Sequence, residues 1–323
     1  MEGVAAAMAM TYGRIEGLDK PVSRLVLGCG SFRPEDLPRA AAVLDAFLEA
    51  GGTALDTAHI YGRDGASERA LGQWLAGDAA RRGRVVLVTK GAHHDSAWKP
   101  RVTPEVIAAE LGESLERLGT DHVDLYLLHR DDPAAPVGPI VECLNAHAAA
   151  GRVTAFGGSN WTPARLRAAN AYATAHGLRG FAASSPHLAL GVARDPAHMG
   201  HSIVTADAEA LAWYRESQFP LLAWTSQAQG FFSDRADPDN PAARQRFRRY
   251  DAPDNWERRR RAIELAARLG RTPTQVALAW LLGQPLAVHP IIGPGSAAHL
   301  RESVEALDIR LSPQELAWLN LEA

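Results

Sequence analysis

Four side chains able to perform acid–base chemistry stand at the ends of three apolar runs. Asp56 ends the first run, and Tyr61 lies in the turn that follows it. Lys90 ends the second run and His129 ends the third. In a barrel of parallel strands, the carboxyl ends of all strands face one mouth, where active sites are built. If these runs are consecutive strands, the four groups converge on one small volume.

The chemistry that these groups suggest is protonation of a carbonyl oxygen while hydride arrives at its carbon. A phenol such as Tyr61 is a weak acid at neutral pH, but an adjacent ammonium such as Lys90 favours the phenolate. Asp56 can hold the lysine charged, and His129 can donate a hydrogen bond that polarises the carbonyl. Each residue alone is more typical of a structural polar group. Their order at consecutive strand ends favours a catalytic site.

Four features of the sequence together resemble the aldo-keto reductase superfamily, over residues 12–319. They are Asp-Thr-Ala-His-Ile-Tyr-Gly at 56–62, Lys90, Leu-Leu-His at 127–129 and Gly-Gly-Ser-Asn-Trp at 157–161. The resemblance implies a (β/α)8 barrel that binds a nicotinamide cofactor without a Rossmann fold. It also implies that Tyr61 is the general acid/base and that Asp56, Lys90 and His129 complete a tetrad.

Composition sets limits on the class of protein. The chain has 323 residues, of which 46% are hydrophobic and 22% charged, as in an ordinary globular protein. The net charge of −3 gives no field that would attract nucleic acid or an anionic membrane. Two cysteines, far apart, make a disulfide scaffold improbable. With no secretory signal and no long apolar run, we expect a cytoplasmic protein, monomeric or homo-oligomeric, whose residues 1–11 are frayed.

Strands and helices alternate along residues 12–323, which predicts a parallel sheet. Strands are expected at 24–28, 53–56, 84–90, 123–129, up to Gly157, 180–184, 219–224 and 287–292. Helices are expected at 37–49 and near 66–79, 104–118, 137–149, 162–176, 206–217, 257–269, 273–283, 297–306 and 313–320. A single-domain α/β (β/α)8 TIM barrel fits best. An open doubly wound sheet is the second-ranked fold, because the Gly-x-Gly-x-x-Gly motif typical of its dinucleotide-binding members does not follow the first strand.

Two connections are long enough to be lids over the C-terminal face of the barrel, where the site is expected. They are residues 186–205, the first loop, and residues 226–256, the second loop. Arginines are frequent from 244 to 261, but acidic residues interrupt them, which favours a solvated lid over a nucleic-acid surface.

Further positions are assigned to the cofactor by the resemblance. Ser159 and Asn160 would bind the carboxamide, with Ser185 where a glutamine is usual, and Trp224 would stack on the nicotinamide. The remaining candidates, for the pyrophosphate and adenosine, are Thr225, Ser226, Gln227, Gly230, Gly293, Gly295, Ser296, His299 and Ser303.

The choice between NADP and NAD depends on a cation for the ribose 2′-phosphate. Many family members carry Lys or Arg just after the last strand, whereas this chain reads Ile-Gly-Pro-Gly-Ser at 292–296. The family favours NADPH, with Arg301 or an arginine of the second loop as a substitute cation, and NADH is the alternative.

Aromatic and polar side chains near the expected mouth are candidates for binding the substrate. Phe32, Trp98 and Trp161, with Trp224 and Arg130, would suit a sugar-like carbonyl compound. The spacing of His93-His94-Asp95 matches no standard zinc pattern, so we expect no metal.

Two alternatives to a reductase remain open at this point. One is a cofactor-independent barrel isomerase or lyase that uses the same acid–base groups. The other is a regulatory protein that binds the cofactor as a sensor without useful turnover.

Overall fold

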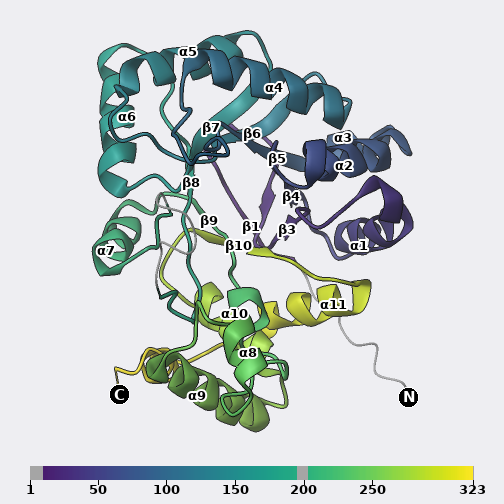
Figure 1. Cartoon of the computed structure of the whole chain (residues 1–323), viewed down its shortest axis with the longest axis vertical. Helices are drawn as coiled ribbons and strands as arrows, with labels where there is room; N and C mark the ends of the chain where they lie inside the picture. Colours follow the sequence, from purple (N-terminus) through teal and green to yellow (C-terminus); the bar gives the residue numbers. More distant parts are fainter. Residues whose placement is uncertain (1–9, 195–202, 323) are drawn as a thin grey trace.

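Eight parallel strands close into a barrel in this computed structural model, which describes residues 10–194 and 203–322 (Figure 1). The last strand pairs with both its predecessor β9 and the first barrel strand β3, which closes the cylinder. The predicted (β/α)8 fold is therefore confirmed. The barrel strands are β3 (Val26–Gly28), β4 (Ala54–Asp56), β5 (Val86–Gly91), β6 (Val123–Leu128), β7 (Val153–Ser159), β8 (Ala183–Ser185), β9 (Leu221–Ala223) and β10 (Val288–Ile292).

Helices surround this barrel, and ten of them were expected with ends that differ by at most a few residues. Thr103 and Thr162 cap two helices, because their side chains accept hydrogen bonds from backbone N–H groups of the first turns. The short helices α3 and α8 were not expected. The helices are α1 (Leu37–Glu49), α2 (Ala66–Ala76), α3 (Ala80–Arg84), α4 (Pro104–Leu118), α5 (Val137–Ala149), α6 (Pro163–Ala175), α7 (Ala208–Ser217), α8 (Pro241–Arg246), α9 (Pro253–Leu269), α10 (Pro273–Leu282), α11 (Ala297–Glu305) and α12 (Pro313–Leu319).

Strand residues alternate between the inside of the barrel and the layer between barrel and helices. On β6, Leu125 and Leu127 belong to a buried cluster that also holds residues of β3, β4, β5, β7, β8 and β9. Tyr126 and Leu128, between and after them, pack with residues of the surrounding helices. Because both faces of each strand are buried, the strands read as continuous apolar runs.

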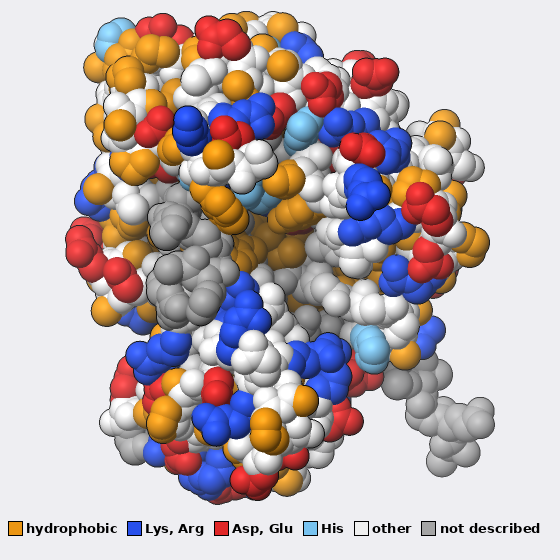
Figure 2. Space-filling view, viewed as in Figure 1, with side chains coloured by type: hydrophobic (Ala, Val, Ile, Leu, Met, Phe, Trp, Pro, Cys, Tyr) orange, Lys and Arg blue, Asp and Glu red, His pale blue; other side chains and the backbone are white. Residues whose placement is uncertain are grey.

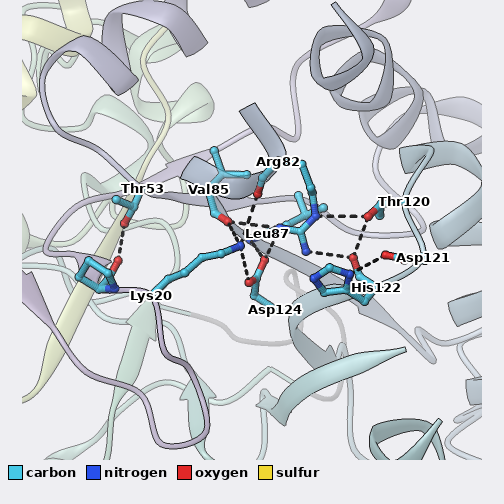
Figure 3. Close-up of polar contacts among 10 residues, drawn as sticks. Lys20, Thr53, Arg82, Val85, Leu87, Thr120, Asp121, His122 and Asp124 are labelled. Atoms are coloured by element: carbon cyan, nitrogen blue, oxygen red, sulfur yellow. Dashed lines mark hydrogen bonds and ion pairs between the residues drawn. The ribbon is translucent and has the colours of Figure 1, made fainter. Parts of the chain in front are cut away.

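A small antiparallel hairpin precedes the barrel, formed by β1 (Tyr12–Gly13) and β2 (Val22–Ser23). Its buried Ile15 packs into the inner barrel cluster. The connecting residue Lys20 donates to Asp124 at the start of β6, and Arg82 of α3 reaches the same carboxylate (Figure 3). This hairpin was not predicted from the sequence. Met10 is buried, and residues 1–9 of the segment expected to be frayed lie outside the described part.

Both long loops reach the mouth of the barrel. The described part of the first loop contains a bridge between His187 and Trp224, and the second loop contains α8 and the start of α9. The face seen in Figure 2 is hollowed near its centre, between the part of the molecule that carries α4–α6 and the part that carries α8 and α9.

Candidate active site

The four predicted catalytic residues meet at the carboxyl ends of β4, β5 and β6. Lys90 Nζ lies 2.6 Å from Asp56 Oδ1 and donates also to the Thr57 carbonyl at 2.9 Å. The same ammonium is 5.0 Å from the centroid of the Tyr61 ring. The Tyr61 and His129 rings meet edge to face, with centroids 5.5 Å apart. The phenol, the ammonium and the imidazole therefore surround one small volume.

Lys90 is charged although it is buried. Its exposed fraction is 2% and that of Asp56 is 3%. Burial by itself lowers the pKa of Lys90, but the Asp56 carboxylate and the Tyr61 phenol outweigh burial and raise that pKa above its ordinary value. The ammonium is thus a fixed positive charge beside the phenol at neutral pH.

His129 is held in the neutral form. Burial, followed by the positive charges of Lys90 and Arg130, lowers the pKa of His129 well below its ordinary range. Its Nδ1 is buried and has no hydrogen-bond partner among the described residues. The ring of His93 packs edge-on against it, with centroids 4.8 Å apart. A neutral imidazole in this position offers one N–H group to a bound ligand.

A cavity of about 660 Å³ opens above these residues, and a second cavity of about 710 Å³ shares Gln227 and Gly293 with it. The first is the catalytic cavity. Besides the tetrad its wall includes His93, Arg130, Ser159, Asn160, Ile203, Trp224, Thr225, Ser226, Gln229 and Arg249. The second, the side cavity, is lined by Gly230, Asp234, Arg235, Thr272, Gly295, His299, Glu302 and Ser303 among others.

Three groups predicted to contact the nicotinamide, Ser159, Asn160 and Trp224, lie in the wall of the catalytic cavity. Asn160 has left-handed backbone geometry (φ 60°), and its amide donates to the His129 carbonyl and to Ser159 Oγ, both at 3.1 Å. Trp224 is half-buried, and its Nε1 is buried without a partner in the described chain. His187 packs edge-on against the Trp224 ring at 4.8 Å, which fixes the indole from the first loop.

Two other predicted cofactor ligands do not offer their side chains to a cavity. Ser185 is fully buried, and its hydroxyl donates to the Leu222 carbonyl of β9 at 2.8 Å. Ser296 caps α11, because its hydroxyl accepts the His299 N–H at 3.2 Å. Both hydroxyls are therefore already used within the fold.

Three of the four aromatic residues expected to contact the substrate do not line the cavity. Phe32 and Trp161 are both buried in the large core between barrel and helices, and Trp161 Nε1 donates to the Arg130 carbonyl. Trp98 is 48% exposed beside His93 and is not part of the cavity wall. Of the five residues expected to bind the substrate, Arg130 and Trp224 line the cavity, so most of the aromatic surface on which the expectation of a sugar-like substrate rested lies outside its wall.

Sequence reasoning missed several residues of the wall. His93 stands three residues after Lys90, so its position beside a predicted strand end was a usable signal. Gly30 gave a weaker signal. A Cβ at this position would lie 3.2 Å from the Tyr61 ring, so glycine leaves room for the phenol. Arg235 and Arg249 come from the second loop, and no pattern in that loop indicated which arginines turn inward.

Within residues 10–194 and 203–322 no group of three His, Cys, Asp or Glu side chains could hold a metal ion. No helix in the same part of the chain is long and apolar enough to cross a membrane.

Known proteins resemble this chain over nearly its whole length. The sequence model of the Aldo/keto reductase family matches residues 24–320. The Uncharacterized oxidoreductase YrpG of Bacillus subtilis (strain 168) is 32% identical, over 97% of this chain and 95% of that protein. Aldo-keto reductase str7 of Strobilurus tenacellus is 28% identical (85% and 78%), and the Putative aryl-alcohol dehydrogenase AAD14 of Saccharomyces cerevisiae is 25% identical (95% and 86%). The chain belongs to the aldo/keto reductase family and is an oxidoreductase of that type.

Proposed function

We propose that the protein reduces an aldehyde or ketone, or oxidises the corresponding alcohol, with a nicotinamide cofactor, NADPH being preferred. The observation that carries this proposal is the meeting of Tyr61, Lys90, Asp56 and His129 in the wall of one cavity. The same cavity shares Gln227 and Gly293 with a second one of similar size, and the two together give room for a dinucleotide as well as a carbonyl substrate.

The residues present fit a nicotinamide dinucleotide. The half-buried indole of Trp224 offers a flat surface, and the N–H at its edge has no partner among the described residues. Ser159 and Asn160 line the same cavity; their donors are used within the fold, so their side-chain oxygens are the groups left to accept from a ligand. The turn 225–230 lines both cavities and therefore lies where the central pyrophosphate would have to pass. Gly230, at φ 84°, lets the backbone of this turn take a left-handed conformation.

The tetrad divides the chemistry among its members. When bound, the nicotinamide supplies the hydride that the carbonyl carbon accepts. The Tyr61 hydroxyl gives its proton to the carbonyl oxygen, and the Lys90 ammonium stabilises the negative charge that develops on the phenol. Asp56 fixes Lys90 in place through the 2.6 Å contact. The neutral His129 donates a hydrogen bond that orients the carbonyl oxygen.

The preference for NADPH is assigned to Arg235, an arginine of the second loop. It lines the side cavity with His299, whereas Arg301 lines neither cavity. A Cβ on Gly230 would lie 2.3 Å from an Arg235 guanidinium nitrogen, so the glycine leaves space for this cation. A guanidinium suits a phosphate because it can donate two parallel hydrogen bonds.

The test is to titrate the purified protein with NADPH and, separately, with NADH while following tryptophan fluorescence. Saturable quenching followed by consumption of the reduced cofactor with an aldehyde panel supports the reductase. Arg235→Gln should weaken the binding of NADPH by roughly tenfold, which corresponds to the loss of a charge-assisted hydrogen bond, and should leave the binding of NADH unchanged. If neither cofactor binds, the proposed function is refuted. If Arg235→Gln weakens the binding of NADPH and NADH equally, the assignment of Arg235 is refuted.

A further inference from the structure

The catalytic cavity carries an excess of positive charge. Its wall contains one carboxylate, Asp56, which is paired with Lys90 at 2.6 Å. The other two cations of the wall, Arg130 and Arg249, have no ion pair with a carboxylate among the described residues. The histidines do not change this balance, because both His93 and His129 are neutral at pH 7.

Arg130 is an unusual member of this wall because it is 91% buried and incompletely bonded. Its exposed fraction is 9%. One terminal nitrogen donates to the His129 carbonyl at 3.1 Å, while the buried Nε has no partner in the described part of the chain. Its own backbone carbonyl is fixed by the Trp161 indole at 3.1 Å. Arg130 is therefore a positioned guanidinium with unused donors.

The nearest carboxylates in the sequence, Asp131 and Asp132, form no ion pair with Arg130 within the described residues. Asp131 is engaged by Arg165, which donates to both of its oxygens at 2.9 and 3.0 Å. Asp132 uses an oxygen to accept the Ala134 backbone N–H. A buried arginine is ordinarily paired, because desolvating an uncompensated charge is costly. The missing counter-charge is thus expected from a ligand.

The position of Arg130 points to the substrate rather than the cofactor. It directly follows His129, at the end of β6. The turn 225–230 and residues 293–303, proposed above for the cofactor phosphates, follow β9 and β10. In the order around the barrel, β7 and β8 lie between β6 and β9. An anion held by Arg130 is therefore beside the reacting carbonyl.

We propose that the substrate is a carbonyl compound carrying an anionic oxygen group, a carboxylate or a phosphate, which Arg130 binds. Ile60, Ile203 and Trp224 give the same cavity apolar walls for the body of the molecule. This inference rests on the proposed reductase function and names its substrate class. Arg130 is a specificity-determining residue, so removing its charge acts chiefly on KM.

The first experiment compares matched aldehydes. Reduction of para-carboxybenzaldehyde and para-formylphenyl phosphate is measured against the neutral methyl ester of the first. In the wild type, kcat/KM for at least one anion should exceed that for the ester by about 10- to 100-fold, the weight of a hydrogen bond to a charged group. Arg130→Gln should abolish the preference through KM, and Arg130→Lys should retain part of it.

The matched control is Arg248→Gln, which removes the same charge from an exposed residue outside the cavity wall. It should leave the preference for the anion intact. Equal turnover of ester and both anions by the wild type, or a preference that survives Arg130→Gln, overturns the inference while the reductase stands.

A binding experiment keeps the inference testable if no aldehyde is reduced, an outcome that would count against the proposed function itself. Binding of benzoate and of the neutral benzamide is then followed by tryptophan fluorescence of the whole chain. Tighter binding of benzoate that is lost in Arg130→Gln supports the anion site. Benzoate binding no tighter than benzamide overturns it. Thermal unfolding of both Arg130 variants separates loss of binding from loss of folding.

Discussion

Tyr61 is the residue whose removal separates chemistry from binding most cleanly. It is half-buried, and its ring contacts the Lys90 ammonium and the His129 ring. Tyr61→Phe keeps these ring contacts and removes the proposed proton donor. We expect kcat to fall by roughly 100- to 10,000-fold, the usual contribution of a general acid. The Kd for NADPH should change less than twofold; unchanged turnover would remove Tyr61 from the acid role.

Lys90 couples activity to stability because it is one half of a buried ion pair. Lys90→Met should reduce kcat about as strongly as Tyr61→Phe, since the charge that supports the phenolate is lost. It also leaves the Asp56 carboxylate buried without its partner, which costs about 3–5 kcal/mol of unfolding free energy. The two losses can be measured by steady-state kinetics and urea unfolding.

The matched control for Lys90→Met is the double variant Asp56→Asn/Lys90→Met. It removes both charges, so most of the lost stability should return while activity stays low. A double variant with near wild-type turnover would show that the ammonium has no role in the reaction.

The position of a side chain could be predicted where the end of its strand alone determined its direction. Asp56, Lys90 and His129 point into the cavity because the carboxyl ends of their strands form the mouth. Ser185 also ends a strand, but its hydroxyl is taken by the Leu222 carbonyl of a strand far along the chain. Trp161 turned away for a similar reason, since Phe181 packs against it with ring centroids 4.9 Å apart. Such competing partners are distant in the sequence and cannot be predicted from the local spacing of residues.

At the scale of elements, the hairpin below the barrel depends on one carboxylate. Asp124 accepts hydrogen bonds from Lys20 and Arg82 and from the Leu87 backbone N–H, at 2.8 to 2.9 Å (Figure 3). These contacts join the hairpin, α3 and strands β5 and β6. The hairpin strands have two residues each, too short to produce a periodic pattern, so the sequence could not predict them.

Asp124→Asn should therefore destabilise the fold without affecting the reaction. The amide cannot satisfy three donors, two of them cationic, and we expect a loss of about 2 kcal/mol of unfolding free energy, since the two cations are partly exposed. The kcat should not change, because Asp124 lies near the amino end of β6, opposite the mouth. Asp121→Asn, the same change at an exposed residue, is the control for urea unfolding. Equal stability of the two variants would contradict this role of Asp124.

For the whole molecule, the alternation of strands and helices was sufficient to predict the barrel, because each of the eight strand runs paired with its neighbour in the chain. The pairing that closes the barrel is long-range, because β10 pairs with β3 although most of the sequence lies between them. His289 of β10 lies at this closure. It is buried, and its Nδ1 is 3.0 Å from the Ser23 carbonyl of the hairpin.

The neutral state of His289 makes the closure of the barrel sensitive to acid. Burial, with the charge of Arg24, lowers the pKa of His289 to about 4, against about 6.5 in an unfolded chain. Below pH 6.5 the unfolded state binds the proton more readily, so stability is lost as pH falls from 6.5 towards 4. Between pH 7 and pH 5 this one group should cost about 2 kcal/mol.

His289→Gln isolates that contribution, because the amide keeps a donor for the Ser23 carbonyl but does not titrate. Urea unfolding at pH 7 and pH 5 gives, for the wild type and for the variant, the change in unfolding free energy on acidification. Other titrating groups contribute equally to both changes, so their contributions cancel when one change is subtracted from the other. The wild type should lose about 2 kcal/mol more than the variant on acidification. Equal losses would mean that His289 is not held neutral, and that the hairpin and β10 stay joined by the apolar packing of Ile15 and Val22 instead.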